Sequence, residues 1–185
     1  MKEIKLSIVA AVYNLEKYLP RCLDALVNQT LQEIEILCVD DGSTDSAPQI
    51  IEDYQKRYPE KIKVFHKENG GEFTTRNYGL ERATGEYVTF VDTDDYVEKD
   101  WAERLYNAAK ENDADLAVCA FERIDLKTNK VVATNMTNFG NAVKEINSKD
   151  DYLLFINPAP WNKVYKREKI KDLRFLPFRG FNDTM

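Results

Sequence analysis

Continuous apolar runs recur along the first part of the chain. The runs at 6–13, 34–39 and 87–91 are typical of strands that are buried on both faces of a parallel sheet. Shorter runs at 62–66 and 115–121 predict two further strands. Each run is bounded by polar or turn-forming residues, so the pattern predicts several separate strands.

Segments whose apolar residues lie three or four positions apart separate these strands and predict amphipathic helices. We expect the first helix to follow Asn14, which is a good N-cap residue, and to extend to Leu26. The other predicted helices cover 47–58, 73–83 and 101–109. Strands that alternate with helices in this way predict right-handed βαβ crossovers and a doubly wound, mostly parallel α/β sheet.

Beyond residue 121 the regular pattern fades. Residues 130–134 predict an added edge strand, and residues 149–156 predict a short helix. No linker separates this part from the rest, so we expect a single domain over 1–185. Its core would span 1–121, and an irregular C-terminal region would span 122–185.

Composition narrows the class of protein. The 185 residues are 43% hydrophobic and 31% charged, which is typical of a soluble globular protein. A net charge of −6 with scattered Lys and Arg argues against a nucleic-acid partner. We expect Cys22, Cys38 and Cys119 to be buried, reduced thiols of a cytosolic protein. No apolar run approaches the length of about 18 residues that a membrane span needs.

Polar residues gather where the predicted strands end. Asp40 and Asp41 follow the second strand, and Asp92, Asp94 and Asp95 follow the fourth. In an open parallel sheet, ligands bind outside the carboxyl ends of the strands. The same edge receives two other polar groups, Tyr13-Asn14 and the turn at 69–71.

The three carboxylates at 92–95 repel one another unless a cation sits among them. Asp92 and Asp94 alternate in an extended chain, so we expect both side chains on one face of the strand. Their oxygens suit Mg²⁺ or Mn²⁺ held jointly with a phosphate. The alternative is an acidic turn whose last Asp caps the next helix.

The other polar groups fit a nucleotide. A carboxylate after the second strand can accept hydrogen bonds from a base imide or a ribose hydroxyl, and Tyr13 can stack on the base. Arg76 lies one turn inside the predicted third helix and can reach a phosphate. The residues therefore predict a site for a nucleoside diphosphate and a metal.

In combination these motifs resemble the signature of family 2 glycosyltransferases, which are inverting, metal-dependent enzymes with the GT-A fold. The resemblance extends to about residue 120, and the order of the motifs makes it specific. The matching segments are 11–14 (AVYN), 29–30 (QT), 35–36 (EI), 39–45 (VDDGSTD), 69–71 (NGG), 76–79 (RNYG) and 92–95 (DTDD).

The resemblance implies a GT-A type, Rossmann-like sheet and transfer of a sugar from a nucleoside-diphosphate sugar, with UDP as the expected nucleotide. The acceptor would be a hydroxyl of a carbohydrate or lipid-linked saccharide, in cell-surface polysaccharide or glycoconjugate synthesis. Asp94 and Asp95 would bind the metal, either Mn²⁺ or Mg²⁺. The donor-binding residues would be Ala11, Tyr13, Asp40, Asp41, Arg76, Asp92, Thr93 and Asp94.

Individual roles also follow from the resemblance. Tyr13 and Asp41 would contact the base, and Asp40 would shape its pocket. Ala11 departs from relatives that carry a hydroxyl there, so one base contact differs. Residues 160–167 (PWNKVYKR) resemble a motif that precedes the catalytic acid in many members. Asp183 would then be the general base that takes the proton of the acceptor hydroxyl, although Asn182 departs from the usual Glu.

Members of this family generally continue beyond the point where this chain stops. We therefore expect a truncated C-terminus, with the missing part shaping the acceptor site and contacting a membrane peripherally. The expected location is the cytoplasm, including the inner face of the membrane.

Other classes of protein that could carry these residues make different demands on the sequence. A non-catalytic sugar-nucleotide-binding module, or an inactive fragment, would share the donor site but transfer nothing. A sugar-1-phosphate nucleotidyltransferase would need a Gly-rich, basic loop after the first strand, where this chain has residues 13–16 (YNLE). A receiver domain would need its acidic pair there. A glycosidase also uses paired carboxylates but has no use for a Tyr13/Asp41 pocket.

Overall fold

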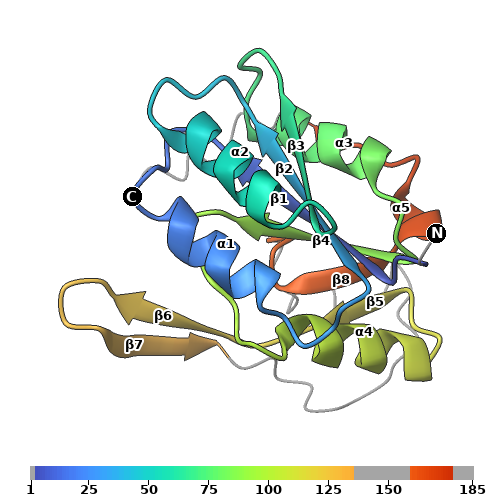
Figure 1. The fold of residues 1–185 in the computed structure, drawn as a ribbon. Coiled ribbons are helices and arrows are strands. Elements are labelled where there is room, and N and C mark those ends of the chain that lie inside the picture. Colours follow the sequence, from blue (N-terminus) through green and yellow to red (C-terminus); the bar gives the residue numbers. More distant parts are fainter. Residues whose placement is uncertain (1–2, 136–158, 177–185) are drawn as a thin grey trace.

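The computed structural model describes residues 3–135 and 159–176, and it forms an α/β fold (Figure 1). The strands of its main sheet are β1 (Leu6–Val12), β2 (Ile34–Asp40), β3 (Ile62–His66), β4 (Tyr87–Asp92), β5 (Leu116–Val118) and β8 (Lys163–Lys166). The helices are α1 (Leu19–Val27), α2 (Ala47–Arg57), α3 (Glu72–Arg82), α4 (Trp101–Glu111) and α5 (Arg167–Ile170).

The six strands lie in the order β3-β2-β1-β4-β8-β5. β1 pairs in parallel with β2 and β4, and β2 pairs in parallel with β3. β8 pairs antiparallel with both of its neighbours, β4 and β5, and so runs opposite to the other strands of this sheet. The predicted α/β class with a mostly parallel sheet is confirmed.

Helices cover both faces of the sheet. α1, α2 and α4 pack on one face and build the larger hydrophobic core, whereas α3 packs on the other (Figure 1). Side chains of β4 pack into both hydrophobic cores, one on each face of the sheet. Tyr87 and Val91 enter the larger core, and Val88 and Phe90 enter the smaller one. This alternation explains why the strand is a continuous apolar run.

α3 lies very close to β1. A Cβ atom at Gly79 would come within 2.3 Å of Val9 Cγ1, so a side chain at this position would push the helix away from the sheet. Glycine is therefore needed here for the close approach of two elements.

The region after β5 differs from expectation. β6 (Phe121–Asp125) and β7 (Lys130–Asn135) form a separate two-stranded sheet. The expected strand at 115–121 is therefore divided between β5 and β6, and the expected edge strand at 130–134 pairs only with β6. Val131 and Val132 are exposed, so the apolar run reflects β propensity rather than burial.

The strand β8 and the helix α5 were not predicted. Both have only four residues, and β8 begins and ends with lysine, so neither shows a periodic apolar pattern. β8 is placed by the long-range hydrogen bonds that it makes between β4 and β5. The helix predicted at 149–156 lies outside the described residues.

The N-cap expected at Asn14 is wrong, because α1 begins at Leu19. Proline in the first turn favours a helix start there. Asn14 instead adopts a left-handed backbone with φ of 53°, which asparagine tolerates. Its Oδ1 accepts a hydrogen bond from Thr44 N at 2.8 Å, which joins the loops after β1 and β2.

Cys22 and Cys38 are free and buried, as expected, and Cys119 is free but only partly buried. Burial raises the pKa of the Cys38 thiol to about 12, so this thiol stays protonated at neutral pH. Within residues 3–135 and 159–176, no helix is long and apolar enough to cross a membrane.

A buried carboxylate ties the amino ends of four strands together. Glu35 of β2, whose side chain is 2% exposed, accepts hydrogen bonds from Ser7 Oγ at 2.6 Å and Lys63 Nζ at 2.6 Å. The backbone N–H of Thr84, just before β4, donates to the same carboxylate at 2.6 Å. Burial raises the pKa of Glu35, but these hydrogen bonds outweigh it and hold the pKa below the ordinary value of 4.5.

We expect Glu35→Gln to lower the free energy of unfolding at pH 7 by about 2 kcal/mol, because charge-assisted hydrogen bonds are lost from a buried site. Urea unfolding measures this difference. A carboxyl group with a lowered folded pKa stabilises the protein above its ordinary pKa, and that contribution is lost as the pH falls through the folded pKa. The gap between wild type and Glu35→Gln should therefore narrow below pH 4.5.

Asp53→Asn is the control, since Asp53 pairs with Lys56 on the exposed face of α2. Its stability should stay close to that of wild type. Equal losses in the two variants would show that the Glu35 network does not stabilise the fold.

Candidate functional site

The carboxyl ends of the parallel strands bring the predicted acidic residues to one edge of the sheet. Asp40 pairs in register with Val12 on one side and His66 on the other, and Asp92 pairs with Ala11. The ends of β3, β2, β1 and β4 therefore form one row. The structure thus places Asp40 and Asp92 at the edge where ligands of open parallel sheets bind.

Asp40 closes the turn after β2. Its Oδ1 accepts the backbone N–H of Ser43 at 3.0 Å, and its Oδ2 lies 3.0 Å from His66 Nδ1. The second ring nitrogen of His66 lies 3.4 Å from a Glu52 oxygen. The sequence contained no signal for this role of His66, because a histidine at a strand end is ordinarily a surface residue.

Asp41 organises the loop between β3 and α3. Its two oxygens accept the backbone N–H groups of Gly70 and Gly71, each at 2.9 Å, and Lys67 Nζ also binds the carboxylate. Burial raises the pKa of Asp41, but hydrogen bonds from Lys67, Gly70 and Gly71 outweigh it and hold the pKa below its ordinary value. Asp41 is therefore a buried anion that positions backbone around the candidate base pocket.

Two residues of the same edge belong to β1 and its extension. Tyr13 follows β1 and is 49% exposed, so its ring is available to a ligand. Ala11 is half-buried, and its carbonyl accepts a hydrogen bond from Thr93 Oγ1 at 2.8 Å. Thr93 thereby ties the turn after β4 to β1.

Arg76 neutralises Asp92. Its Nη2 lies 2.6 Å from Asp92 Oδ1 and also contacts Glu72, one helical turn earlier. The Arg76 side chain is 7% exposed and that of Asp92 is 30% exposed, so the guanidinium is shielded from solvent while the carboxylate is partly accessible. The mutual repulsion of these acids predicted a cation among them, but for Asp92 the protein itself supplies an opposite charge. Arg76 is distant in sequence and reaches Asp92 only because α3 packs against the sheet.

β4 ends at Asp92, and Asp94 lies in the turn that follows. The strand alternation used to place Asp92 and Asp94 on one face therefore does not apply. Asp94 and Asp95 are exposed as whole residues, but the carboxyl group of Asp95 is partly buried. Burial of the carboxyl group, with the nearby negative charges of Asp94 and Asp92, raises the pKa of Asp95 to about 6.

The acids after β4 are the candidate ligands of a metal ion. Within the described residues, no group of three or more His, Cys, Asp or Glu side chains could hold a metal ion. The hard oxygens of Asp94 and Asp95 and their mutual repulsion nevertheless suit a divalent ion that takes its remaining ligands from a substrate. The residues therefore fit a shared metal rather than one enclosed by protein.

Asp183, the predicted general base, lies outside the described residues. Residues 160–167 are described, and they contribute β8 to the sheet. Because β8 runs antiparallel to β4, its first residues lie toward the edge where β4 ends. There Trp161 packs against Phe121, with ring centroids 4.6 Å apart.

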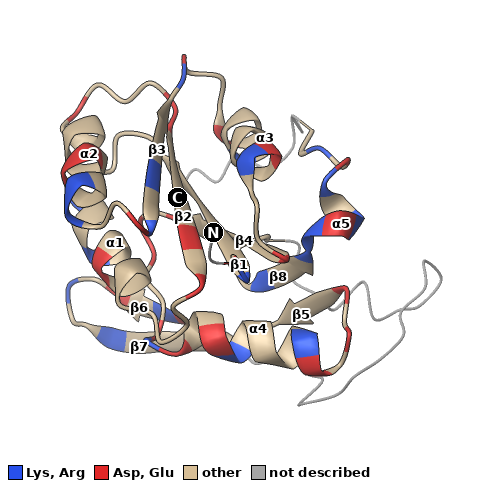
Figure 2. Cartoon of the chain, turned by 45° about the vertical axis from the view of Figure 1, so that its right-hand side comes forward, with Lys and Arg blue, Asp and Glu red and all other residues tan. Residues whose placement is uncertain are grey.

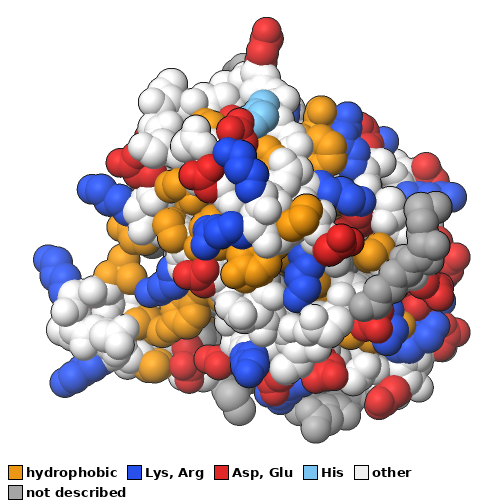
Figure 3. Space-filling view, viewed as in Figure 1, with side chains coloured by type: hydrophobic (Ala, Val, Ile, Leu, Met, Phe, Trp, Pro, Cys, Tyr) orange, Lys and Arg blue, Asp and Glu red, His pale blue; other side chains and the backbone are white. Residues whose placement is uncertain are grey.

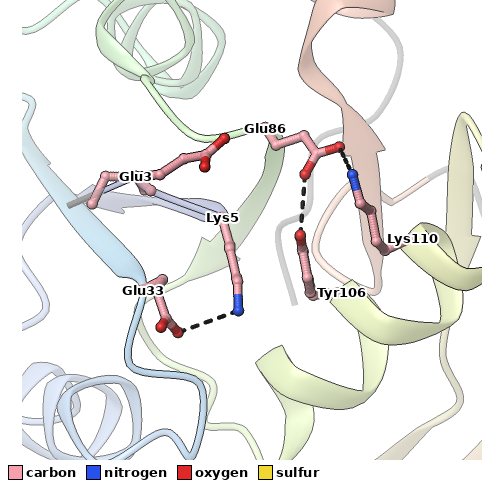
Figure 4. A pocket seen from close by; sticks show the side chains of 7 residues that line it. Glu3, Lys5, Glu33, Glu86, Tyr106 and Lys110 are labelled. Carbon is pink, nitrogen blue, oxygen red and sulfur yellow. Dashed lines mark hydrogen bonds and ion pairs between the residues drawn. The ribbon is translucent and has the colours of Figure 1, made fainter.

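A pocket of about 400 Å³ lies at the opposite edge, next to the amino ends of β1, β2 and β4. Four of its charged groups are paired with one another (Figure 4). Lys5 lies 3.6 Å from Glu33, and Glu86 binds Lys110 at 2.7 Å and the hydroxyl of Tyr106 at 3.1 Å. This edge is the solvated, mixed-charge surface that its lysines and glutamates predict.

Charges elsewhere are also mixed. Figure 2 shows basic and acidic residues interspersed along the helices, and Figure 3 shows no large field of one sign on the visible face.

Comparison with known proteins identifies the class. Residues 7–174 match the family described as glycosyl transferase family 2. The match covers most of the chain, and this protein therefore belongs to that family. The motifs at the sheet edge and the family match agree.

Individual relatives support this assignment. The chain is 36% identical over 182 residues to the putative glycosyltransferase EpsH of Bacillus subtilis, covering 97% of this chain and 52% of EpsH. It is 44% identical over 118 residues to the poly(ribitol-phosphate) beta-glucosyltransferase of Bacillus spizizenii, covering 62% of this chain and 19% of that protein. The chain thus spans about half the length of EpsH and a smaller part of the glucosyltransferase.

The fold also matches a solved structure. TarS 1–349 of S. aureus, crystallised in complex with UDP, aligns with a TM-score of 0.74 and 30% sequence identity. The alignment covers 91% of this chain and 48% of TarS 1–349. The GT-A fold predicted from the sequence is therefore confirmed.

We expect Asp41→Asn to loosen the loop at 67–71, because an amide cannot replace the charge that binds Lys67 and accepts two backbone N–H groups. Amide hydrogen exchange at Gly70 and Gly71, measured by NMR, should become about tenfold faster. Asp45→Asn is the control, since Asp45 binds Glu16 N and Ala47 N in a neighbouring loop. Unchanged exchange in Asp41→Asn would rule out this role for Asp41.

Proposed function

We propose that this chain contains the donor-binding part of a glycosyltransferase that moves a sugar from a nucleoside-diphosphate sugar to an acceptor hydroxyl. The observation that carries the proposal is the gathering of Asp40, Asp41 and Asp92 at one sheet edge of a family 2 fold. Similarity to TarS, solved with UDP and with UDP-GlcNAc, favours a UDP-sugar as donor.

The donor base would lie between the ends of β1 and β2. Tyr13 offers an exposed ring for stacking, and Asp41 presents a buried carboxylate with loop N–H groups around it. Asp40 would shape the pocket through Ser43 and His66. Ala11 and Thr93 would form the strand-end surface beneath the ribose.

A divalent ion, Mn²⁺ or Mg²⁺, would be held by Asp94 and Asp95. When bound, such an ion stabilises negative charge on a departing diphosphate. Asp92 would contact the ribose and the metal while Arg76 holds its carboxylate in place. The exposure of Asp94 and Asp95 leaves room for the phosphate oxygens to complete the ion's ligands.

Asp183 would act as the general base. An acceptor hydroxyl is a poor nucleophile at neutral pH, so a carboxylate on the acceptor side must take its proton as the oxygen attacks the anomeric carbon. A single displacement of this kind inverts the anomeric centre. The acceptor would be a carbohydrate or lipid-linked saccharide, and similarity to the poly(ribitol-phosphate) beta-glucosyltransferase supports a role in polymer synthesis.

We expect a thermal-shift panel of UDP and GDP, each with and without Mn²⁺, to show the largest stabilisation with UDP and Mn²⁺. No shift with any of these ligands would contradict the proposed donor site. A larger shift with GDP would replace uridine by guanosine in the proposal.

Asp94→Ala should abolish the part of UDP binding that depends on Mn²⁺, because a metal ligand is removed. Isothermal titration with and without Mn²⁺ measures this part. Asp100→Ala is the matched control, since Asp100 lies further along the same loop and pairs with Arg104. If Asp94→Ala and wild type gained equally from Mn²⁺, Asp94 would not be a metal ligand.

Asp183→Asn should retain UDP binding and lose sugar transfer by at least about a hundredfold, because the amide cannot accept the acceptor's proton. A release assay for UDP with a saccharide acceptor measures turnover. Normal transfer by this variant would show that another group is the base.

A further inference from the structure

The chain that follows α5 is attached to α3 by one side chain. Asn77 Nδ2 donates to the carbonyl of Phe175 at 2.9 Å, and its Oδ1 accepts the Phe175 N–H at 2.8 Å. The amide thus satisfies both backbone groups of one residue, as a neighbouring strand would. Figure 1 shows the chain after α5 turning back beside α3.

This clamp places the Phe175 ring in the smaller core. The ring meets Phe90 of β4 edge-to-face, with centroids 5.0 Å apart and an interplanar angle of 84°. Aromatic pairs prefer this geometry. Phe175 therefore cannot shift without breaking either its backbone bonds to Asn77 or its contact with β4.

The same ring lies next to Arg76. The guanidinium carbon is 5.7 Å from the Phe175 centroid, within the range of a cation–π contact. Arg76 Nε is buried and has no hydrogen-bond partner among the residues that the structure describes. An apolar cover that excludes water strengthens the ion pair between Arg76 and Asp92, but it leaves this N–H unpaired.

We propose that Asn77 is a positioning residue of the donor site, acting through Phe175 to hold Arg76 dry and aligned on Asp92. The inference rests on the proposed function, because it assumes that Asp92 contacts the donor. It assigns separate tasks to adjacent residues of one helix. Arg76 holds the carboxylate, Asn77 holds the cover over Arg76, and Gly79 lets the helix approach the sheet.

The test compares Asn77→Ala with Asn112→Ala in the full 185-residue chain. Asn112 Nδ2 donates to the Ala108 carbonyl at the end of α4, away from α3, so its removal reports an ordinary loss of stability. Both melting temperatures are measured, together with the dissociation constant of UDP in the presence of Mn²⁺. We expect Asn77→Ala alone to weaken UDP binding, by about tenfold.

The hydrogen exchange of Arg76 Nε–H, followed by NMR, is a readout that a general loss of stability would not move selectively. It should become about tenfold faster in Asn77→Ala, relative to the exchange of other buried protons, because water reaches the guanidinium. Phe175→Leu keeps apolar bulk in the core but removes the ring, and it should reproduce the loss of UDP affinity. If Asn77→Ala does not fold, the UDP affinity of Phe175→Leu tests the proposal instead.

A double-mutant cycle with Arg76→Lys tests the route of action. If Asn77 acts through Arg76, adding Asn77→Ala to Arg76→Lys should cause no further loss of UDP affinity. Additive losses would overturn the inference, as would wild-type affinity in both Asn77→Ala and Phe175→Leu. Failure of the wild-type chain to bind UDP would instead overturn the proposed function, and this inference with it.

Discussion

The candidate site depends on the contact between α3 and β1. At Gly79 the helix approaches Val9 so closely that no side chain fits between them. This spacing brings Arg76 within 2.6 Å of Asp92 and Asn77 within hydrogen-bond reach of Phe175. A helix held further from the sheet would move all of these groups together, because they project from adjacent positions on one rigid element. The geometry of the donor edge is therefore set by packing in the smaller core.

The two edges of the sheet have different physical characters. At the amino edge, a buried carboxylate, Glu35, joins four strands, and nearby charges form the pairs Lys5–Glu33 and Lys110–Glu86. At the carboxyl edge, Asp94 and Asp95 remain exposed beside one another, and the pKa of Asp95 is raised to about 6 by burial and by its acidic neighbours. The Glu35 network holds the entry of β4 to β1 and β2. It thereby helps to set the register that brings Asp92 beside Ala11 at the other end of the strand.

Much of the fold could be predicted from local pattern. Four parallel strands and four helices carry clear local signals. β1, β2 and β4 are buried on both faces and read as apolar runs, whereas the helices bury one face and repeat their apolar residues every three or four positions. The convergence of Asp40, Asp41 and Asp92 followed from the rule that parallel strands share their carboxyl edge. β8 was not predictable in this way, since a four-residue strand has no period of its own and is formed by its partners in the sheet. The start of α1 was likewise decided by local turn geometry, and the pairing of β7 was decided by its neighbour β6.

The sequence by itself determined the class of fold, the edge that carries the polar residues and the family. These properties depend on residue type and spacing along the chain, which a sequence displays directly. Only the tertiary structure showed that Arg76 neutralises Asp92, that Lys67 and His66 bind the acids after β2, and that Asn77 clamps Phe175. Each of these contacts joins residues from different elements. Its existence depends on distances of a few ångströms that are set by packing, and no local pattern encodes such distances.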